Sequence, residues 1–228
     1  MVHSADAARA ALFDVDGTLV DTNYLHVVAW WEAFRQAGHT VPMADIHRTV
    51  GMGADRLPAH LLGESRDPAR EEAVRQAHAA LYAAHFPTLT ALPGAADLLR
   101  AVSRAGWRVV LASSASGTEL AAMRRALDAD DVIDDATSGD DVDTTKPAPD
   151  LVAEAVRRAG APTRDTVFVG DTVWDMKACG RAGVTALGVL SGGIPRADLA
   201  EAGAARVYAG PADLLAHLDA SPLAGPRS

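Results

Sequence analysis

The chain has 228 residues, of which 49% are hydrophobic and 22% charged, and its formal net charge is −9. This is the composition of a globular protein that can bury a sizeable core, and the length allows one large domain or two small ones. Basic residues form no run or stripe, which argues against a nucleic-acid-binding protein. No apolar run is long enough to cross a bilayer, and the N-terminus lacks the pattern of a secretory signal.

Two further features of the composition concern compartment and ligand. Cys179 is the only cysteine, so no internal disulfide can form. We therefore expect a soluble, cytoplasmic protein, a monomer or weak homodimer, with no nucleic-acid or membrane partner. Because the global charge is negative, an anionic substrate must be captured by a local positive site.

Short apolar runs predict the strands of a sheet. Residues 10–15 end in acidic residues and Gly-Thr, residues 107–112 end in serines, and residues 166–169 end in Gly170 and Asp171. Runs of this length, bounded by turn residues, are typical of buried strands. Further strands are expected at residues 132–133, which form a weak pattern, and at 184–190 and 205–208.

Helical patterns lie between these runs and predict the layers around the sheet. Strands that alternate with helices at this spacing indicate a parallel sheet covered on both faces. The helices are expected at residues 95–105, 118–127, 150–159 and 174–182.

The segment 22–90 interrupts this alternation, because it holds no clear strand. Glycines separate four helical patterns within it, at residues 25–37, 43–49, 54–62 and 68–85. We therefore predict an α/β fold: a three-layer Rossmann-like core made of residues 1–21 and 91–228, with residues 22–90 inserted as an all-helical cap domain.

Polar clusters follow the predicted strands at their carboxyl ends. In an open parallel sheet, ligands bind outside these ends, near the point where the strand order reverses. One crevice is therefore expected to collect carboxylates, hydroxyls and one ammonium group, from Asp14, Asp16, Ser113, Ser114, Lys146, Asp171 and Asp175.

The acidic pair after the first strand points to a metal ion. Alternation along the strand places Asp14 and Asp16 on one side and Val15 on the other. Two adjacent carboxylates repel and raise a pKa unless a cation holds them. Mg²⁺ suits one or two carboxylates together with a phosphate oxygen. The alternative is a solvated acidic turn.

A second acidic pair follows the fourth strand. Asp175 comes one helical turn after Asp171, on the same side. Helix N-capping by Asp171 or Thr172 is the structural alternative. It explains either residue alone, but not the second acid.

Lys146 and the serines supply candidate phosphate contacts. Lys146 and Lys177 are the two lysines in the chain, and Pro147 and Pro149 stiffen the loop that follows Lys146. Lysine at this position indicates a need for a compact ammonium group, although a lone surface lysine is usually solvated. Ser113 and Ser114 offer hydroxyl and backbone N–H groups just before a helix, a plausible cradle for phosphate.

Taken together, these clusters resemble the four motifs of the haloacid dehalogenase-like superfamily. They appear in order as DVDGT, the serine that ends VVLAS, the lysine of KPAPD, and GDTVWD. The resemblance covers essentially the whole chain. The inserted helical segment is similar to the cap of phosphoglycolate phosphatases and β-phosphoglucomutases.

The resemblance implies a catalytic role for each motif residue. Asp14 would be the nucleophile that forms an aspartyl-phosphate. Asp16 would protonate the leaving oxygen and then activate water. Ser113 and the backbone of Ser114 would bind the phosphoryl oxygens, and Lys146 would hold the nucleophile and the phosphoryl group together.

The resemblance also implies a Mg²⁺ site. Its ligands would be Asp14, the Asp16 carbonyl and Asp171, with Asp175 in or near the coordination sphere. An acid at position 16 favours phosphoryl transfer over dehalogenation, because the resemblance implies that dehalogenases lack it.

The choice between phosphatase and mutase depends on the cap. His26 and Trp30 stand where β-phosphoglucomutases have a similar pair. However, segment 22–90 has no lysine, and the arginine expected after Gly53 is replaced by Ala54, with Arg56 displaced. We favour a phosphatase acting on a small phosphorylated metabolite of the phosphoglycolate or sugar phosphate class; a mutase is the alternative.

Two cap residues are candidate substrate contacts, His26 and Arg56. A packing histidine and a solvated arginine are the alternatives for them.

A response-regulator receiver domain is a rival from another class. It also combines an acidic pair, a hydroxyl and a Lys-Pro pair around a phosphorylated aspartate. The chain is too long for one such domain, and the inserted helices have no place in it.

Overall fold

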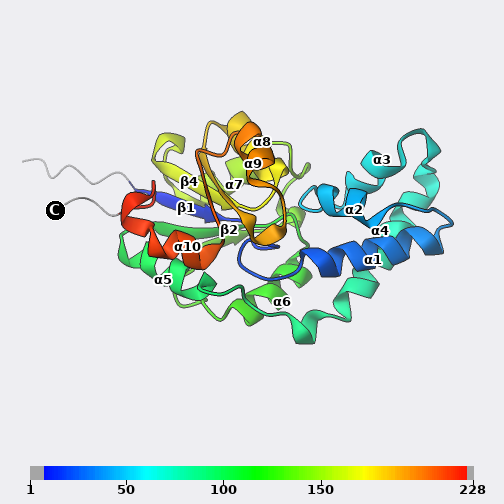
Figure 1. The fold of residues 1–228 in the computed structure, drawn as a ribbon, viewed down its shortest axis with the longest axis horizontal. Helices are drawn as coiled ribbons and strands as arrows, with labels where there is room; N and C mark the ends of the chain where they lie inside the picture. The colour runs from blue at the N-terminus through cyan, green and yellow to red at the C-terminus, as the bar shows by residue number, and fades with distance from the viewer. Residues whose placement is uncertain (1–7, 225–228) are drawn as a thin grey trace, which may run out of the picture.

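The computed structural model describes residues 8–224. Its centre is a six-stranded sheet with the order β3-β2-β1-β4-β5-β6, in which every neighbouring pair is parallel (Figure 1). The predicted α/β fold is confirmed. The strands are β1 (Ala10–Phe13), β2 (Arg108–Ala112), β3 (Asp135–Thr137), β4 (Thr166–Gly170), β5 (Thr185–Val189) and β6 (Arg206–Tyr208).

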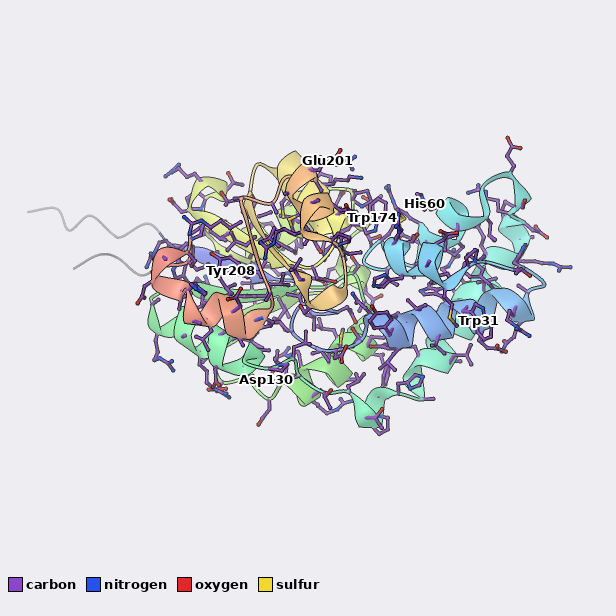
Figure 2. The ribbon with its side chains drawn as sticks, viewed as in Figure 1. Trp31, His60, Asp130, Trp174, Glu201 and Tyr208 are labelled. Carbon is purple, nitrogen blue, oxygen red and sulfur yellow. The ribbon has the colours of Figure 1, made fainter. Side chains whose placement is uncertain are left out.

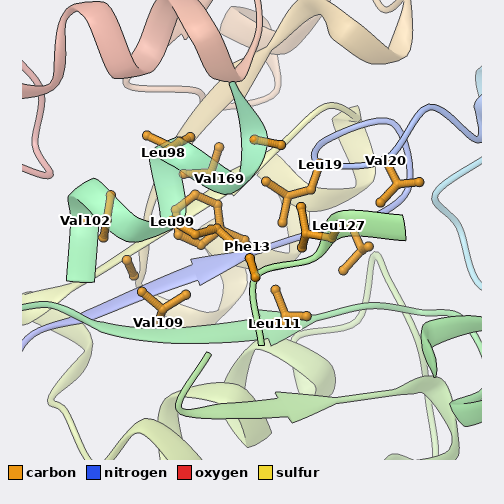
Figure 3. Close-up of a cluster of buried hydrophobic side chains, with 14 of the residues drawn as sticks. Phe13, Leu19, Val20, Leu98, Leu99, Val102, Val109, Leu111, Leu127 and Val169 are labelled. Atoms are coloured by element: carbon orange, nitrogen blue, oxygen red, sulfur yellow. The ribbon is translucent and has the colours of Figure 1, made fainter. Parts of the chain in front are cut away.

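The sheet separates two apolar layers because successive side chains of a strand point to opposite faces. Ala11 and Phe13 of β1 belong to one buried cluster, and Ala10 and Leu12 belong to another. Figure 3 shows the first cluster, in which Phe13 lies beside Leu99 and Val169. Helices cover both faces, which gives the three layers.

A different set of helices covers each face of the sheet. Residues of α5 (Ala95–Arg104), α6 (Gly117–Leu127) and α10 (Pro211–Ala216) enter the first cluster. Residues of α7 (Asp150–Ala159), α8 (Val173–Ala182) and α9 (Arg196–Glu201) enter the second. Short 3-10 turns are η1 (Gly63–Ser65), η2 (Phe86–Thr88), η3 (Gly139–Asp141), η4 (Thr163–Asp165), η5 (Leu190–Gly192) and η6 (Leu218–Ala220).

The segment after β1 forms a helical group beyond the sheet, on the right of Figure 1. Its helices, called the cap helices below, are α1 (Asn23–Gln36), α2 (Met43–Thr49), α3 (Leu57–Leu62) and α4 (Pro68–Ala83). They bury an apolar cluster of their own, to which Trp30, Phe34 and Ile46 belong. The division into two domains at these boundaries remains a prediction, and residues 1–7 and 225–228 lie outside the described range.

The third strand differs from the prediction. It begins at Asp135, and residues 132–133 precede it. The Asp134 N–H donates to the Val109 carbonyl at 2.9 Å, and its carboxylate accepts from the Val109 N–H at 2.8 Å, so alignment with β2 starts only there. Val132 and Ile133 instead pack, partly buried, against the first cluster.

Two short helices, α9 and α10, were not predicted. Each has six residues, too few for a clear helical period. A proline directly before α9 and another at the first position of α10 are the signals that could have found them. Within residues 8–224, no helix combines the length and the apolar character that a membrane span requires.

The packing of the helical group can be tested within one helix. Phe34 is 0% exposed, whereas Val28, also on α1, is 47% exposed. Phe34→Ala should lower the free energy of unfolding by about 3–5 kcal/mol, because it opens a cavity. Val28→Ala should change it by less than about 0.5 kcal/mol. Urea denaturation followed by tryptophan fluorescence measures both, and equal effects would contradict the packed cluster.

Candidate active site

The polar residues that end β1 and β4 meet around one buried lysine. The Lys146 ammonium lies 2.6 Å from Asp14 Oδ1 and 2.7 Å from Asp175 Oδ1, and the side chain is 1% exposed. One carboxylate oxygen each from Asp14, Asp171 and Asp175 lie within 4.8 Å of one another. The structure therefore brings together three of the predicted acids and the predicted ammonium.

Burial makes this cluster electrostatically costly. Desolvation raises the pKa of Asp14 to about 7, although the Lys146 charge opposes the shift. Burial, together with the charges of Asp14 and Asp175, raises the pKa of Asp171 well above its usual range. Burial alone would lower the pKa of Lys146, but the two carboxylates it contacts outweigh this and raise it. Three carboxylates share one ammonium, so the donor set fits an added hard divalent cation.

Neutral donors fix Asp171 in place. The Thr18 hydroxyl donates to Asp171 Oδ1 at 2.9 Å, and the Asn23 side-chain amide donates to Oδ2 at 2.8 Å. Gly17 permits this arrangement, because a Cβ there would lie 2.5 Å from Asp171 Oδ2, and its φ is +67°. Neither Thr18 nor Asn23 was predicted as a site residue.

Thr172 is the N-cap of α8, as one of the two sequence alternatives had it, and Asp175 both completes this cap and reaches the site. Its Oδ2 accepts from the N–H and the hydroxyl of Thr172, at 3.0 and 2.6 Å, in the capping box of α8. Its Oδ1 contacts Lys146. The capping role therefore orients the second oxygen towards the site.

Asp16 is turned away from the carboxylate cluster. Its Oδ1 accepts from the Thr22 hydroxyl at 2.7 Å and lies 3.0 Å from His26 Nε2. Burial alone would raise the pKa of Asp16, but the His26 charge and the hydrogen bonds from His26 and Thr22 outweigh it and lower the pKa. Burial alone would lower the pKa of His26, but the charge of Asp16 and its hydrogen bond to the ring raise it. Asp16 and His26 therefore hold one proton between them.

A second histidine extends this pair into the cap helices. His78 Nε2, on α4, lies 3.1 Å from His26 Nδ1. The His78 ring also stacks on Trp30, with centroids 3.9 Å apart. Burial and the neighbouring His26 charge hold the pKa of His78 well below its usual value. No sequence pattern selects His78, since α4 carries no motif.

The serines after β2 lie beside Asp16. The buried Ser113 hydroxyl is 3.5 Å from Asp16 Oδ2 and accepts from the Ala115 N–H at 3.1 Å. Ser114 Oγ is buried and has no hydrogen-bond partner among the described residues. A buried hydroxyl without a partner is uncommon, and here it fits a site that a ligand completes.

A pocket of about 70 Å³ lies between the sheet edge and the cap helices. Asp14, Asp16 and Ser114 line it from the sheet, and His26 and Trp30 line it from α1. The cap loop 50–54 closes it from the other side.

That cap loop approaches the core closely because it contains Gly51 and Gly53. A Cβ on Gly53 would overlap the Thr145 hydroxyl, and one on Gly51 would lie 2.6 Å from Thr172. The sequence pattern indicates only that these glycines separate helices, whereas they also let the loop contact the core beside Lys146.

Neither Arg56 nor Trp174 lines this pocket. The Arg56 Nε is 3.8 Å from Asp55 Oδ2. The Trp174 indole N–H donates to the Arg48 carbonyl of α2 at 3.2 Å, and its ring meets His60 edge-on. Figure 2 shows Trp174 and His60 where α8 faces the cap helices.

Comparison with known proteins identifies the family. The model of the haloacid dehalogenase-like hydrolases matches residues 8–183. A hydrolase from Pseudomonas syringae superposes with a TM-score of 0.89 at 36% identity, over 93% of this chain and 98% of its own. A phosphoglycolate phosphatase from Rhodospirillum rubrum is 28% identical over 213 residues, 88% of this chain and 86% of the relative. A putative β-phosphoglucomutase from Bacteroides vulgatus, with a TM-score of 0.85 at 19% identity over 95% and 89% of the two chains, shares the fold.

The chain belongs to the haloacid dehalogenase-like hydrolases. The resemblance to the group of phosphoglycolate phosphatases and β-phosphoglucomutases is confirmed. The prediction of an enzyme is also confirmed: it is a hydrolase whose relatives include proteins named phosphatases.

Metal binding should stabilise the folded protein. Mg²⁺ at about 100 times its dissociation constant should add about 2.7 kcal/mol to the free energy of unfolding. Asp171→Asn should abolish this gain, whereas Glu201→Gln, at an exposed position, should retain it. Thermal unfolding with MgCl₂, compared with NaCl at equal ionic strength, tests this, and an equal gain in Asp171→Asn would contradict it.

Without metal, stability should fall as the pH rises. The pKa of Asp14 is raised from 3.8 to about 7, so the folded state binds a proton that the unfolded chain releases. The contribution of Asp14 to the free energy of unfolding should therefore decline from about pH 4 to about pH 7 and stay constant above it. Asp14→Asn should make this decline shallower. Urea denaturation in EDTA across this range measures it, and an unchanged slope in the variant would refute the assignment.

Proposed function

We propose that this hydrolase is a Mg²⁺-dependent phosphatase that cleaves a small phosphorylated metabolite through an aspartyl-phosphate on Asp14. The observation that carries the proposal is the buried ammonium of Lys146 between the carboxylates of Asp14 and Asp175. Phosphoryl transfer depends mainly on positioning and charge neutralisation. Asp14, the Asp16 carbonyl, Asp171 and Asp175 would hold Mg²⁺, which would neutralise charge on the phosphoryl oxygens.

The contacts of the two Asp14 carboxylate oxygens support different roles for them in the first step. Lys146 holds Asp14 Oδ1, while Oδ2 has only a 3.5 Å contact with the Thr18 hydroxyl. We therefore assign the attack on phosphorus to Asp14 Oδ2. As the new O–P bond forms, the ester O–P bond breaks, and the leaving oxygen takes the proton held by Asp16 and His26.

The second step returns the enzyme to its starting state. Water attacks phosphorus and gives its proton to the Asp16–His26 pair, while the bond from phosphorus to Asp14 breaks. Ser113, the backbone of Ser114 and Lys146 would hold the phosphoryl oxygens throughout. His78 fixes the outer nitrogen of His26 through the 3.1 Å contact and thereby positions the proton-holding pair.

The charge of the pocket favours a phosphatase over a mutase. A mutase must also bind the second phosphate of its bisphosphate. Lys146 is assigned to the transferred phosphoryl group, and within the described chain no lysine or arginine lines the pocket to receive the other phosphate. His26 and Trp30 do line it, as the mutase alternative requires, so product analysis should separate free phosphate from an isomerised sugar phosphate. Dehalogenation is disfavoured, because Asp16 lines the pocket and, with His26, can supply a proton that an alkoxide leaving group needs and a halide does not.

Compartment and assembly belong to the same proposal. The buried thiol of Cys179 agrees with a reducing, cytoplasmic environment. We propose a monomer or weak homodimer that binds small phosphorylated metabolites.

Hydrolysis of p-nitrophenyl phosphate tests the proposal. The protein should release p-nitrophenolate with Mg²⁺ and lose this activity in EDTA. Asp14→Asn should reduce turnover to the background, because the amide is a poor nucleophile, whereas Asp21→Asn, an exposed acid on the same segment, should retain it. Activity of Asp14→Asn comparable to the wild type would overturn the mechanism.

A further inference from the structure

The mouth of the pocket carries an excess of negative charge. A second hollow of about 390 Å³ adjoins the pocket and shares Ala54, His78, Ser114 and Glu119 with it. Any part of a substrate that extends beyond the phosphoryl site on this side enters the second hollow. Four carboxylates and one guanidinium line it, from Asp55, Glu72, Glu119, Asp140 and Arg75.

The cations near this mouth are already paired. Arg75 Nη2 lies 2.7 Å from Glu72 Oε2, and Arg75 Nη1 lies 3.9 Å from Glu71 Oε2. Arg56, outside the lining, lies beside Asp55, which also accepts a hydrogen bond from the Thr145 hydroxyl. Neither arginine therefore has a free charge for a substrate anion.

The N-terminus of α6 is the other place that could receive an anion, because its N–H groups point outwards. Protein carboxylates occupy these groups. Asp140 Oδ2 accepts from the Gly117 N–H at 2.7 Å, and Glu119 Oε2 accepts from the Ser116 N–H at 2.8 Å. These donors carry no formal charge, so no cationic side chain pairs with either acid through these contacts.

Uncharged polar contacts remain available at the junction of the two hollows. The buried Ser114 hydroxyl lines both hollows and has no partner in the described part of the chain. It could exchange a hydrogen bond with a hydroxyl or ammonium group of the substrate. The apolar side chains of Ala54 and Ala79 complete the passage.

We propose that this pocket selects phosphate monoesters whose leaving group is neutral or positively charged, such as a polyol or amino-alcohol phosphate, and rejects esters that carry a second anion. The proposal rests on the phosphatase function proposed above and deepens it. It separates this enzyme from the phosphoglycolate phosphatase among its relatives, whose named substrate carries a carboxylate.

Three esters of nearly equal size test the charge selection. Ethylene glycol monophosphate is neutral beyond its phosphate, phosphoethanolamine is cationic, and phosphoglycolate is anionic. With Mg²⁺, kcat/KM should be at least about tenfold higher for the first two than for phosphoglycolate, with most of the difference in KM. The ratio should shrink at high salt, because ions screen the exposed carboxylates.

A pair of variants on α4 locates the effect. Ala79 lines the second hollow, whereas the neighbouring Ala80 is also exposed and lines no described pocket. Ala79→Lys should narrow the selectivity against phosphoglycolate several-fold. Ala80→Lys, which makes the same change in net charge, should leave it unaltered.

The outcomes distinguish this inference from the proposed function. If p-nitrophenyl phosphate is hydrolysed but phosphoglycolate is turned over as well as the other two esters or better, the charge selection is wrong. Equal effects of Ala79→Lys and Ala80→Lys would also overturn it, because global charge would then explain the preference. If p-nitrophenyl phosphate itself is not hydrolysed, the phosphatase function fails, and the inference fails with it.

Discussion

The organisation of this protein depends on three carboxylates buried around a single ammonium group. Charges are expensive to bury unless they are paired, and Lys146 pairs directly with Asp14 and Asp175 but not with Asp171. Hydroxyl and amide donors hold Asp171, and they supply no charge. The folded chain therefore keeps a local deficit of positive charge, which a divalent cation would remove. Burial raises the pKa of Asp14 to about 7, and the neighbouring charges of Asp175 and Asp16 add to the effect.

The pairing register of the parallel strands β1 and β4 brings these acids together. β1 and β4 pair with Phe13 opposite Val169, and the Asp14 N–H donates to the Val169 carbonyl at 2.9 Å. Asp14 and Asp171 therefore leave neighbouring strands at the same edge, next to the point where the strand order reverses. The glycine-containing loop 50–54 then brings the cap helices against this edge. The fold thus supplies the charged floor of the pocket, and the cap supplies its walls.

Much of this arrangement could be predicted from the sequence, because the carboxyl ends of parallel strands share one edge of a sheet. That rule alone predicts that Asp14, Lys146 and Asp171 meet. It could not find the neutral groups that hold Asp171, since Thr18 and Asn23 act through side-chain directions that no spacing encodes. The prediction misplaced the third strand because an apolar pair packs equally well beside a sheet as within it. The charge at the pocket mouth comes from four separate segments, and only the folded chain shows that they meet.

Reductive trapping tests the central claim most directly. The enzyme would be quenched during turnover with Mg²⁺ and substrate, treated with borohydride, and mapped by peptide mass spectrometry. Borohydride reduces an acyl phosphate on aspartate to the alcohol, so the account predicts homoserine at position 14 in samples that contained both substrate and Mg²⁺. Turnover with an unmodified Asp14, or with the reduced residue at Asp16, Asp171 or Asp175 instead, would contradict it.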